Sequence, residues 1–564
     1  MNPSVIRLRR TTTRLAIVLA LLCFSVYRTM GTASAEYAEI EGSGSTWAYT
    51  IIQQWIADVS AQGMQITFNN NGSSQGRKDF ANYVTDFADS DIPYQGIDPV
   101  THQSDASSRP YAYLPVVAGG TALTYQLHVA GKLVTNLRLS GETIAKIFTN
   151  KITNWDDPEI TKENGGHALP STPITPVVRS DGSGATAQFT LWMGKEYPSI
   201  WGPYNGGNTG LTSIYPRTGR QVAASGDDGV MNTVDSAAGN GDIGYTEYSY
   251  PLNAHYPVVY VENPAGYYVQ PTQYDVAVAL TQAKINGCNA SGACSPAGLT
   301  PNTYLTQNLD DVYTYKDPRS YPISSYSYMI IPTSSTDQRM TVAKRQTLAD
   351  FLSYDLCTGQ SKAGPYGYSP LPLNLVKASF TQIEKLGPQA SPKPVAGVNI
   401  KNPSANLASC DNPTFVKGDL AANHLAQIAP APLACQKATA VPCGDGTVAP
   451  GTTTQAGSTT TSAGSPGSNG AGAGGTAGAS TGGAATAVDP GSGGTVAPAS
   501  GTGGGTATTG TTDISSVTPT AVQLSAQRNG DNKVFGLVAV AELVAIVLLP
   551  GVYVAWIRRR RGAP

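Results

Sequence analysis

The sequence predicts an α/β fold, because strand-like segments alternate along the chain with segments whose apolar residues recur at helical spacing. Met64–Phe68 alternates like a strand, whereas Trp47, Ile51, Trp55 and Val59 recur like one face of a helix. Turns rich in glycine and serine separate these segments. The chain has 564 residues, more than one hydrophobic core usually holds, so part of it should lie outside the α/β region.

The expected elements follow in a regular order between residues 47 and 193. A helix over 47–59 comes after the turn Gly42-Ser43-Gly44, and the strand at Met64–Phe68 ends in a turn at Asn69–Gly72. We then expect a helix at Arg77–Val84, strands at Leu114–Val117 and Ala122–Leu127, a helix at Gly141–Phe148, a strand at Ile174–Val178 and a helix that ends at Met193.

Residues 1–35 have the order of a secretory signal peptide. Four arginines, the first of them Arg7, precede the apolar run Leu15–Val26, and Ala33-Ser34-Ala35 supplies the small residues of a cleavage site. We expect cleavage after Ala35 and export of the rest of the chain.

The other end predicts a membrane anchor. Val534–Ile557 is apolar with Glu542 as its only charge, and at about 1.5 Å per residue it can cross a hydrocarbon core of about 30 Å. Arg558–Arg561 follow directly, so the positive-inside rule places a tail at 558–564 in the cytoplasm and the preceding chain outside. The expected location is the cell membrane, with a single span and an extracellular binding domain.

Two further regions lie between the α/β part and the anchor. Residues 446–533 consist largely of Gly, Ala, Thr and Ser, which cannot bury enough apolar surface to order a chain, so we expect a disordered linker. Residues 389–445 form an extension that contains cysteines, and the sequence assigns no function to it.

Six cysteines remain after removal of the signal peptide, and an even number in an exported protein predicts disulfides. Six cysteines allow 15 pairings, of which Cys288 with Cys294, closing a short Gly/Ser-rich turn, is the pair we expect. The cysteines have no Cys-x-x-Cys spacing and no histidine cluster, so no metal site is expected. The net charge of −2 provides no basic surface for nucleic acid.

Three Gly/Ser-rich turns each precede an expected helix. They are Gly42-Ser43-Gly44-Ser45-Thr46, Gly72-Ser73-Ser74-Gln75-Gly76 and Asp181-Gly182-Ser183-Gly184-Ala185. The start of a helix presents unpaired backbone N–H groups and a partial positive charge, and serine adds a hydroxyl donor. Together the turns could surround an oxyanion, with Arg179 supplying a full positive charge.

From about Ile40 to Pro372 the chain resembles the phosphate-binding proteins of high-affinity phosphate ABC transporters. The resemblance rests on six words in order: Gly42-Ser43-Gly44-Ser45-Thr46-Trp47; Gly72-Ser73-Ser74-Gln75-Gly76; Val84-Thr85-Asp86-Phe87-Ala88-Asp89-Ser90-Asp91; Ile147-Phe148-Thr149-Asn150-Lys151-Ile152-Thr153-Asn154-Trp155-Asp156-Asp157-Pro158; Arg179-Ser180-Asp181-Gly182-Ser183-Gly184; and Gly241-Asp242-Ile243-Gly244-Tyr245.

The resemblance implies a two-lobe periplasmic-binding-protein type II fold with a hinge. Lobe one would comprise 36–117 and 255–388, and lobe two would comprise 118–254. The protein would deliver inorganic phosphate to the permease of an ABC importer, would need no cofactor and would not be an enzyme. By position, the resemblance implies phosphate contacts from Ser45, Thr46, Trp47, Ser73, Asp91, Arg179, Ser183, Gly184 and Ala185.

Two carboxylates have separate implied roles. Asp91 would accept a hydrogen bond from the phosphate hydroxyl, whereas Asp181 would orient Arg179. Sulfate carries no such proton at neutral pH, so it would leave Asp91 unpaired at a cost of about 1–3 kcal/mol. Ala185 stands where the family usually has threonine, so one hydroxyl donor is missing, and Thr186 is a candidate substitute.

Two other functions fit parts of the sequence. Gly72-Ser73-Ser74-Gln75-Gly76 matches the nucleophile elbow of a serine hydrolase, with Ser74 as nucleophile, although none of the five histidines lies in a matching motif. The same fold could also serve as a membrane-anchored phosphate sensor or as a surface interaction protein, with its many tyrosines forming a contact surface.

Overall fold

The computed structural model describes residues 37–97, 102–390, 393–400 and 410–444. The expected signal peptide, the linker at 446–533, the apolar span at 534–557 and the tail at 558–564 lie outside these residues. Within the described ranges, no helix has the length and apolar character that a membrane crossing requires.

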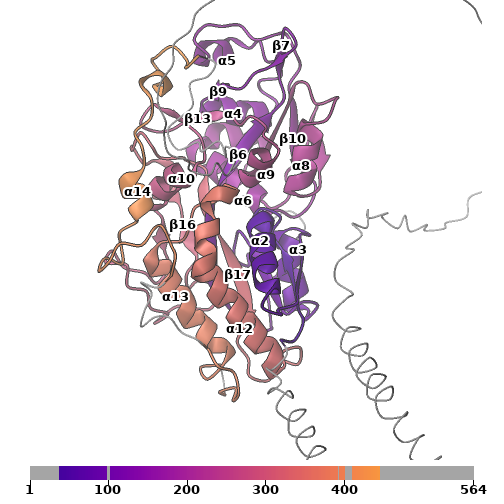
Figure 1. Ribbon diagram of the computed structural model, residues 1–564. Coiled ribbons are helices and arrows are strands. Elements are labelled where there is room, and N and C mark those ends of the chain that lie inside the picture. Colours follow the sequence, from indigo (N-terminus) through magenta and orange to yellow (C-terminus); the bar gives the residue numbers. More distant parts are fainter. Residues whose placement is uncertain (1–36, 98–101, 391–392, 401–409, 445–564) are drawn as a thin grey trace, which may run out of the picture. The chain divides into compact units, whose positions relative to one another are not determined.

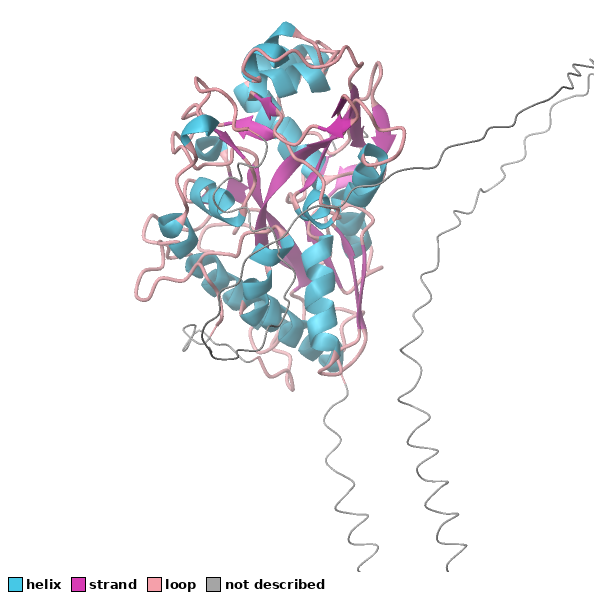
Figure 2. Ribbon diagram, turned by 45° about the horizontal axis from the view of Figure 1, so that its top comes forward, coloured by secondary structure: helices cyan, strands magenta, loops and turns pink. Residues whose placement is uncertain are grey.

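One eight-stranded mixed sheet forms the framework, with helices packed on it (Figures 1 and 2). The strand order is β11-β10-β12-β6-β17-β3-β1-β2. The strands are β1 (Ile40–Gly44), β2 (Ile66–Asn69), β3 (Phe87–Ser90), β6 (Tyr111–Tyr125), β10 (Thr175–Arg179), β11 (Val222–Ala224), β12 (Asp242–Glu247) and β17 (Ser324–Pro332).

Strand β6 connects the two ends of this sheet. Residues 111–120 pair with β17, and 121–125 pair with β12, both antiparallel. The sequence analysis expected two strands here, at Leu114–Val117 and Ala122–Leu127, which is wrong, because the structure has one continuous strand through Gly119 and Gly120. Gly119 instead fits a close contact, since a Cβ on it would lie 2.7 Å from the Trp47 ring. Glycine inside a strand marks such an approach as readily as a turn.

The helices occupy both ends of the sheet, with α8 beside β10 and β12, and α2, α3 and α12 near β1, β2 and β3 (Figure 1). They are α2 (Tyr49–Ser60), α3 (Ser73–Ala81), α4 (Gly141–Phe148), α5 (Pro158–Glu163), α6 (Gly184–Glu196), α7 (Pro198–Tyr204), α8 (Gly226–Val234), α9 (Ser249–Asn253), α10 (Gln273–Leu280), α11 (Asp310–Tyr313), α12 (Val342–Leu356), α13 (Leu373–Ile383) and α14 (His424–Ile428).

Helix boundaries show what the turns contribute. The helix expected at 141–148 is confirmed as α4, where the Ser140 side chain accepts a hydrogen bond from the backbone N–H of Thr143. The helix expected to begin at Arg77 begins at Ser73 instead, with Gly72 at the N-cap. The Gly/Ser-rich motif at Gly72–Gly76 therefore forms largely the first turn of α3, and its serines lie at the start of this helix.

A smaller sheet joins distant segments. It has the order β14-β13-β9 and contains β9 (Arg138–Leu139), β13 (Tyr260–Glu262) and β14 (Tyr268–Val269). Because β13 pairs with β9, residues 260–269 lie beside the segment that the sequence analysis assigned to lobe two. The two-lobe division stays a prediction, and this pairing moves the expected return to lobe one beyond Val269.

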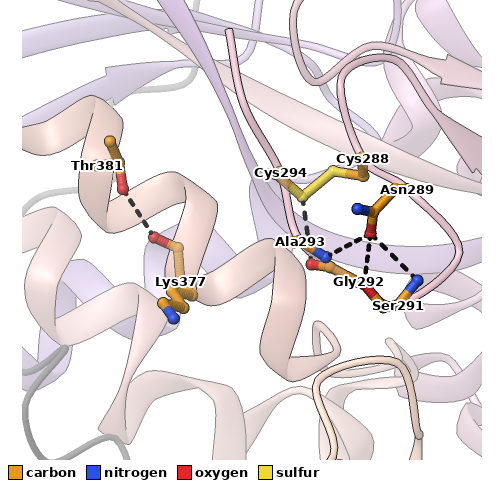
Figure 3. Close-up of a disulfide and its surroundings, with 8 residues drawn as sticks. All are labelled: Cys288, Asn289, Ser291, Gly292, Ala293, Cys294, Lys377 and Thr381. Atoms are coloured by element: carbon orange, nitrogen blue, oxygen red, sulfur yellow. Dashed lines mark hydrogen bonds between the residues drawn. A yellow bond between two sulfur atoms is a disulfide. The ribbon is translucent and has the colours of Figure 1, made fainter.

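Three disulfides are formed within the described residues. The expected pair Cys288–Cys294 is confirmed, and it closes a turn in which the Asn289 side chain accepts hydrogen bonds from backbone N–H groups of the turn (Figure 3). The other pairs are Cys357–Cys410 and Cys435–Cys443. The sequence offered no basis for choosing these two pairs.

The extension packs along the α/β part. Cys410 attaches it to the end of α12, and Leu425 and Ala426 of α14 pack on Ala277 and Val278 of α10. Farther on, Arg138 donates hydrogen bonds to the carbonyl oxygens of Cys435, Lys437 and Ala440. The extension thus contacts elements that are far apart in the sequence.

The Cys357–Cys410 disulfide should contribute substantially to stability. It links residues 53 positions apart, so replacing both cysteines by serine should lower the free energy of unfolding by about 4 kcal/mol through the entropy of the unfolded chain. Calorimetric unfolding of the full-length protein measures this change. The matched control is Cys288→Ser/Cys294→Ser, whose six-residue separation predicts a loss of only about 2 kcal/mol. A smaller loss for the long loop than for the short one would contradict the expectation.

Candidate functional site

The three Gly/Ser-rich turns meet in space. A Cβ on Gly184, at the start of α6, would lie 2.4 Å from Asp91 Oδ2 and 2.6 Å from Ser73 Oγ. The backbone N–H of Ser74 donates to the carbonyl oxygen of Gly182 at 2.9 Å. Residues from 36–117 and from 118–254 are therefore in direct contact, and only a glycine fits at position 184.

Asp91 is a buried carboxylate that accepts hydrogen bonds from three hydroxyl groups. Its Oδ1 accepts from Ser45 at 2.7 Å and from Ser327 at 2.7 Å, and its Oδ2 accepts from Ser73 at 3.1 Å. Each carboxylate oxygen offers about two lone-pair directions. Oδ1 is therefore fully used, whereas Oδ2 can accept one more hydrogen bond beside Gly184.

Ser327 also contacts a second carboxyl group, that of Asp89. The number of protons available to these three groups limits the protonation states of Asp89 and Asp91. The Ser327 Oγ lies 2.6 Å from Asp89 Oδ1 and 2.7 Å from Asp91 Oδ1. A hydroxyl carries one proton and can donate to only one of them, so the other contact needs a proton on a carboxyl group.

Asp89 is protonated more readily than Asp91. Burial, followed by repulsion from Asp91, raises the pKa of Asp89 well above its ordinary value, and its Oδ2 has no hydrogen-bond partner in the described part of the chain. Burial and repulsion from Asp227 also raise the pKa of Asp91, but hydrogen bonds from the hydroxyls of Ser327, Ser45 and Ser73 lower it, so its pKa rises less than that of Asp89. Protonated Asp89 thus donates to Ser327, which donates to an ionised Asp91.

Arg179 lies at the end of β10 with its side chain buried between two carboxylates. Its Nε and Nη2 donate to Asp181 at 2.8 and 2.5 Å, and Nη1 donates to Asp227 Oδ2 at 2.5 Å. Burial tends to lower the pKa of Arg179, but Asp227 and Asp181 outweigh it, so the pKa is raised. Three of the five guanidinium N–H groups are used in this way, and two stay available to an anion.

The sequence analysis missed Asp227, which contacts both halves of the site. Besides Arg179, it accepts a hydrogen bond from the Thr46 hydroxyl at 2.5 Å. Its Oδ1 accepts from the backbone N–H of Glu247 at 2.9 Å and from Thr246 at 3.0 Å. A signal was present, because Ser225-Gly226-Asp227-Asp228-Gly229 is a further glycine-rich turn before a helix.

Several backbone N–H groups at these turns are free to donate. Within the described ranges, the N–H groups of Thr46, Trp47, Gly184 and Ala185 donate to no protein acceptor. The first N–H groups of a helix cannot bond within the helix, which explains this for α6. The Trp47 side chain itself belongs to the core, since its ring packs edge-on against Tyr368. Any role of Trp47 in binding would therefore be through its backbone.

Thr186 does not simply replace the threonine hydroxyl that is missing at Ala185. Its Oγ1 lies 2.7 Å from the Tyr245 hydroxyl, so the two side chains share a hydrogen bond. Either hydroxyl can be the donor of this bond, and the Tyr245 hydroxyl also accepts from the backbone N–H of Arg179 at 3.2 Å. Thr186 thereby helps to fix the end of β10.

The geometry around Ser74 differs from that of a serine nucleophile. Ser74 lies in the first turn of α3, and its Oγ accepts a hydrogen bond from Arg77 at 3.3 Å. None of the histidines in the described residues hydrogen-bonds to Ser74. A serine hydrolase needs such a base, so the local geometry does not support this alternative.

Replacing Asp89 tests the proton assignment. The folded-state pKa of Asp89 is raised, so its contribution to stability is complete below the unfolded value near 3.8 and is lost as the pH rises through the folded value. The Asp89→Asn variant does not titrate there and should become more stable than the wild type as the pH rises. At pH 5 the two proteins should differ by no more than about 1 kcal/mol, because the amide can still donate to Ser327.

Urea unfolding of the full-length protein at pH 5 and pH 8 measures this difference. The matched control is Asp235→Asn, an exposed carboxyl at the end of α8. An Asp89→Asn variant that loses stability relative to the wild type as the pH rises would show that Asp89 is ionised in the folded protein.

Sequence comparison places this chain in a known family. A family model described as a PBP superfamily domain matches residues 31–357, more than half of the chain. The phosphate-binding protein PstS 2 of Mycobacterium tuberculosis is 31% identical over 340 residues, which cover 59% of this chain and 83% of that protein. PstS of Xylella fastidiosa is 30% identical over 342 residues, covering 60% of this chain and 83% of that protein.

A solved structure of a high-affinity periplasmic phosphate-binding protein, PfluDING, aligns with 66% of this chain and 98% of its own, at 20% identity and a TM-score of 0.47. The family assignment rests on the sequence matches and the family model. The chain therefore belongs to the PBP superfamily and, within it, to the family of PstS phosphate-binding proteins.

Proposed function

We propose that this protein binds one inorganic phosphate at the cluster around Asp91 and Arg179. The observation that carries the proposal is the set of groups that the fold leaves unpaired. Free backbone N–H groups from two turns and two guanidinium N–H groups surround a carboxylate that can accept one further hydrogen bond. These groups match an oxyanion that accepts several hydrogen bonds and donates one.

The hydrogen-bond network refines the roles of the serines. The hydroxyl protons of Ser45 and Ser73 are donated to Asp91, so these residues hold the acceptor in place. Ser183 accepts a hydrogen bond from the Thr186 N–H and keeps its own proton to donate. We therefore expect phosphate to receive its donors from Ser183, Arg179 and the backbone, and to donate to Asp91.

Selection against sulfate follows from the same arrangement. Phosphate at neutral pH still carries a proton to donate, whereas sulfate carries none. Sulfate would place negative charge against ionised Asp91 and leave that buried acceptor unpaired, which costs about 1–3 kcal/mol before repulsion is counted.

The family relationship supports a role in phosphate uptake. The relatives are named phosphate-binding proteins, and proteins of this kind are binding components rather than enzymes. The proposal for this chain is that it works outside the cytoplasm, with its lobes closing on phosphate and the closed form docking on an ABC permease. The apolar segment at 534–557 would anchor it in the cell membrane by a single span, with the linker at 446–533 as a tether.

Isothermal titration calorimetry with phosphate, sulfate and molybdate tests the binding site. The full-length protein should bind phosphate one to one and prefer it over sulfate. In Asp91→Asn the amide no longer repels sulfate and can donate to it, so the preference for phosphate should fall by roughly 5- to 150-fold, the equivalent of about 1–3 kcal/mol. Asp235→Asn serves as the control and should keep the wild-type preference. Absence of heat with phosphate even at high excess would sink the proposal.

Transport requires a separate test in cells. Deletion of the gene should lower the rate of phosphate uptake when phosphate is limiting, and the wild-type gene should restore it. A gene encoding the Asp91→Asn variant serves as the comparison and should restore uptake poorly. An unchanged uptake rate in the deletion strain, together with intact phosphate binding in vitro, would favour the sensor or surface-interaction alternative.

A further inference from the structure

Tyr250, which is not among the residues proposed to bind phosphate, contacts the first glycine-rich turn from the second half of the site. It belongs to α9, the short helix after β12, which lies near the start of α2 in Figure 1. Its hydroxyl donates a hydrogen bond to the carbonyl oxygen of Thr46 at 2.5 Å. The bond joins a residue of 118–254 to a residue of 36–117.

The carbonyl group that Tyr250 contacts belongs to the same peptide unit as the backbone N–H of Trp47. That N–H donates to no protein acceptor within the described ranges, although Trp47 is only 1% exposed. A buried N–H without an acceptor is rare, because it costs about as much as a lost hydrogen bond. The N–H of Trp47 therefore needs an acceptor that the described residues do not provide.

A hydrogen bond at the oxygen of a peptide unit affects its N–H in two ways. The unit is planar and trans, so its C=O and N–H point in opposite directions, and holding the Thr46 oxygen sets the direction of the Trp47 N–H. Hydrogen bonds in a chain also polarise one another, so a donor at the oxygen makes the N–H a stronger donor. The Tyr250 hydroxyl is placed to do both.

The surroundings of Tyr250 keep its hydroxyl protonated and hold its partner. Burial raises the pKa of Tyr250 well above its ordinary value, and the negative charges of Asp227 and Asp228 raise it further. The side-chain hydroxyl of Thr46 donates to Asp227 Oδ2 at 2.5 Å. Two groups from 118–254 thus hold Thr46, one at its carbonyl oxygen and one at its side chain.

A second tyrosine holds the next peptide unit of the turn. Tyr368 donates to the carbonyl oxygen of Trp47 at 2.6 Å. The N–H of that unit, on Ala48, donates to the Ser45 hydroxyl at 3.2 Å, and Ser45 donates to Asp91 Oδ1 at 2.7 Å. One chain of hydrogen bonds therefore ends at the acceptor of the proposed site, and the chain that begins at Tyr250 ends at an unpaired donor.

We infer that Tyr250 is a positioning residue for phosphate, whose hydroxyl acts through the Thr46 carbonyl to orient and polarise the Trp47 N–H that donates to the ligand. The inference rests on the proposed phosphate site and adds to it a residue that does not touch phosphate. Tyr250 and Thr46 come from the two parts expected to form separate lobes. In an open protein their hydrogen bond would be broken, and the Trp47 N–H would lose this support.

Isothermal titration calorimetry of the full-length Tyr250→Phe variant with phosphate tests the effect on binding. We expect the dissociation constant to rise by roughly 2- to 12-fold, the range for loss of one ordinary hydrogen bond. The matched control is Tyr215→Phe, which removes a hydroxyl that donates at 2.5 Å to the carbonyl oxygen of Phe148, within 118–254. Each variant loses one such hydrogen bond, so both should lose similar stability, but the control should bind phosphate like the wild type.

Nuclear magnetic resonance separates positioning from a general structural effect. Thr46–Trp47 is the only Thr–Trp pair in the sequence, so protein labelled with ¹³C at the threonine carbonyls and ¹⁵N in tryptophan gives a single signal in an HNCO spectrum. At saturating phosphate, Tyr250→Phe should move the Thr46 carbonyl carbon and the Trp47 amide proton upfield. The carbonyl loses its donor, and the N–H then forms a weaker hydrogen bond. Tyr215→Phe should leave both shifts unchanged.

The outcomes distinguish this inference from the proposed function. If the wild type binds phosphate but Tyr250→Phe has the same affinity, or the same Thr46–Trp47 signal, the inference is wrong and the phosphate site stands. An equal loss of affinity in Tyr215→Phe would also overturn the inference, because the loss would then reflect general destabilisation. If the wild type itself binds no phosphate, the proposed function fails and the inference fails with it.

Discussion

The hydrogen bonds that hold the Asp91 carboxylate determine the geometry of the candidate site. Its hydroxyl donors come from the end of β1, the start of α3 and the middle of β17, which are far apart in sequence. The sheet brings them together, because Asp89 of β3 is opposite Gly44 of β1 on one side and Met329 of β17 on the other. A shift of one residue in either register would turn Ser45 or Ser327 to the opposite face, so the site depends on the register of three adjacent strands.

Asp227 joins the two halves of the site in a similar way. Its carboxylate accepts from Thr46, which belongs to the first part of the chain, and from Arg179, which belongs to the second. The hydrogen bonds of this one buried carboxylate therefore depend on the positions of Thr46 and Arg179 relative to each other. Removing one partner would leave the others unpaired in a buried place, which is more costly than the hydrogen bond itself. In the proposed mechanism of lobe closure, this coupling would help a ligand to favour the closed arrangement.

The sequence predicts local features of this protein well and distant contacts poorly. The glycine-rich turn after a strand pointed to Arg179, because this is a local pattern, whereas Asp91 was predicted only through the family resemblance. Ser327 and Asp89 became visible only through strand pairing, since Ser327 lies more than 200 positions from Asp91. The continuous strand β6 was missed for the same reason, because the partner of Gly119 is a distant ring, Trp47. Local spacing carries no information on either contact.

The charge balance of the site explains why protons, rather than net charge, should decide selectivity. Arg179 is the one cation among the residues proposed to bind phosphate, and Asp181 and Asp227 already oppose that charge. With Asp91 also ionised, the cluster has no positive charge left to attract a dianion. Binding must then depend on neutral N–H and O–H donors aimed at the ligand, helped by the helix start at Gly184. In such a setting an anion that donates a proton to Asp91 gains a hydrogen bond, while one without a proton meets repulsion. In the proposed site, the surrounding carboxylates would strengthen the discrimination, because each makes an unprotonated ligand harder to accommodate.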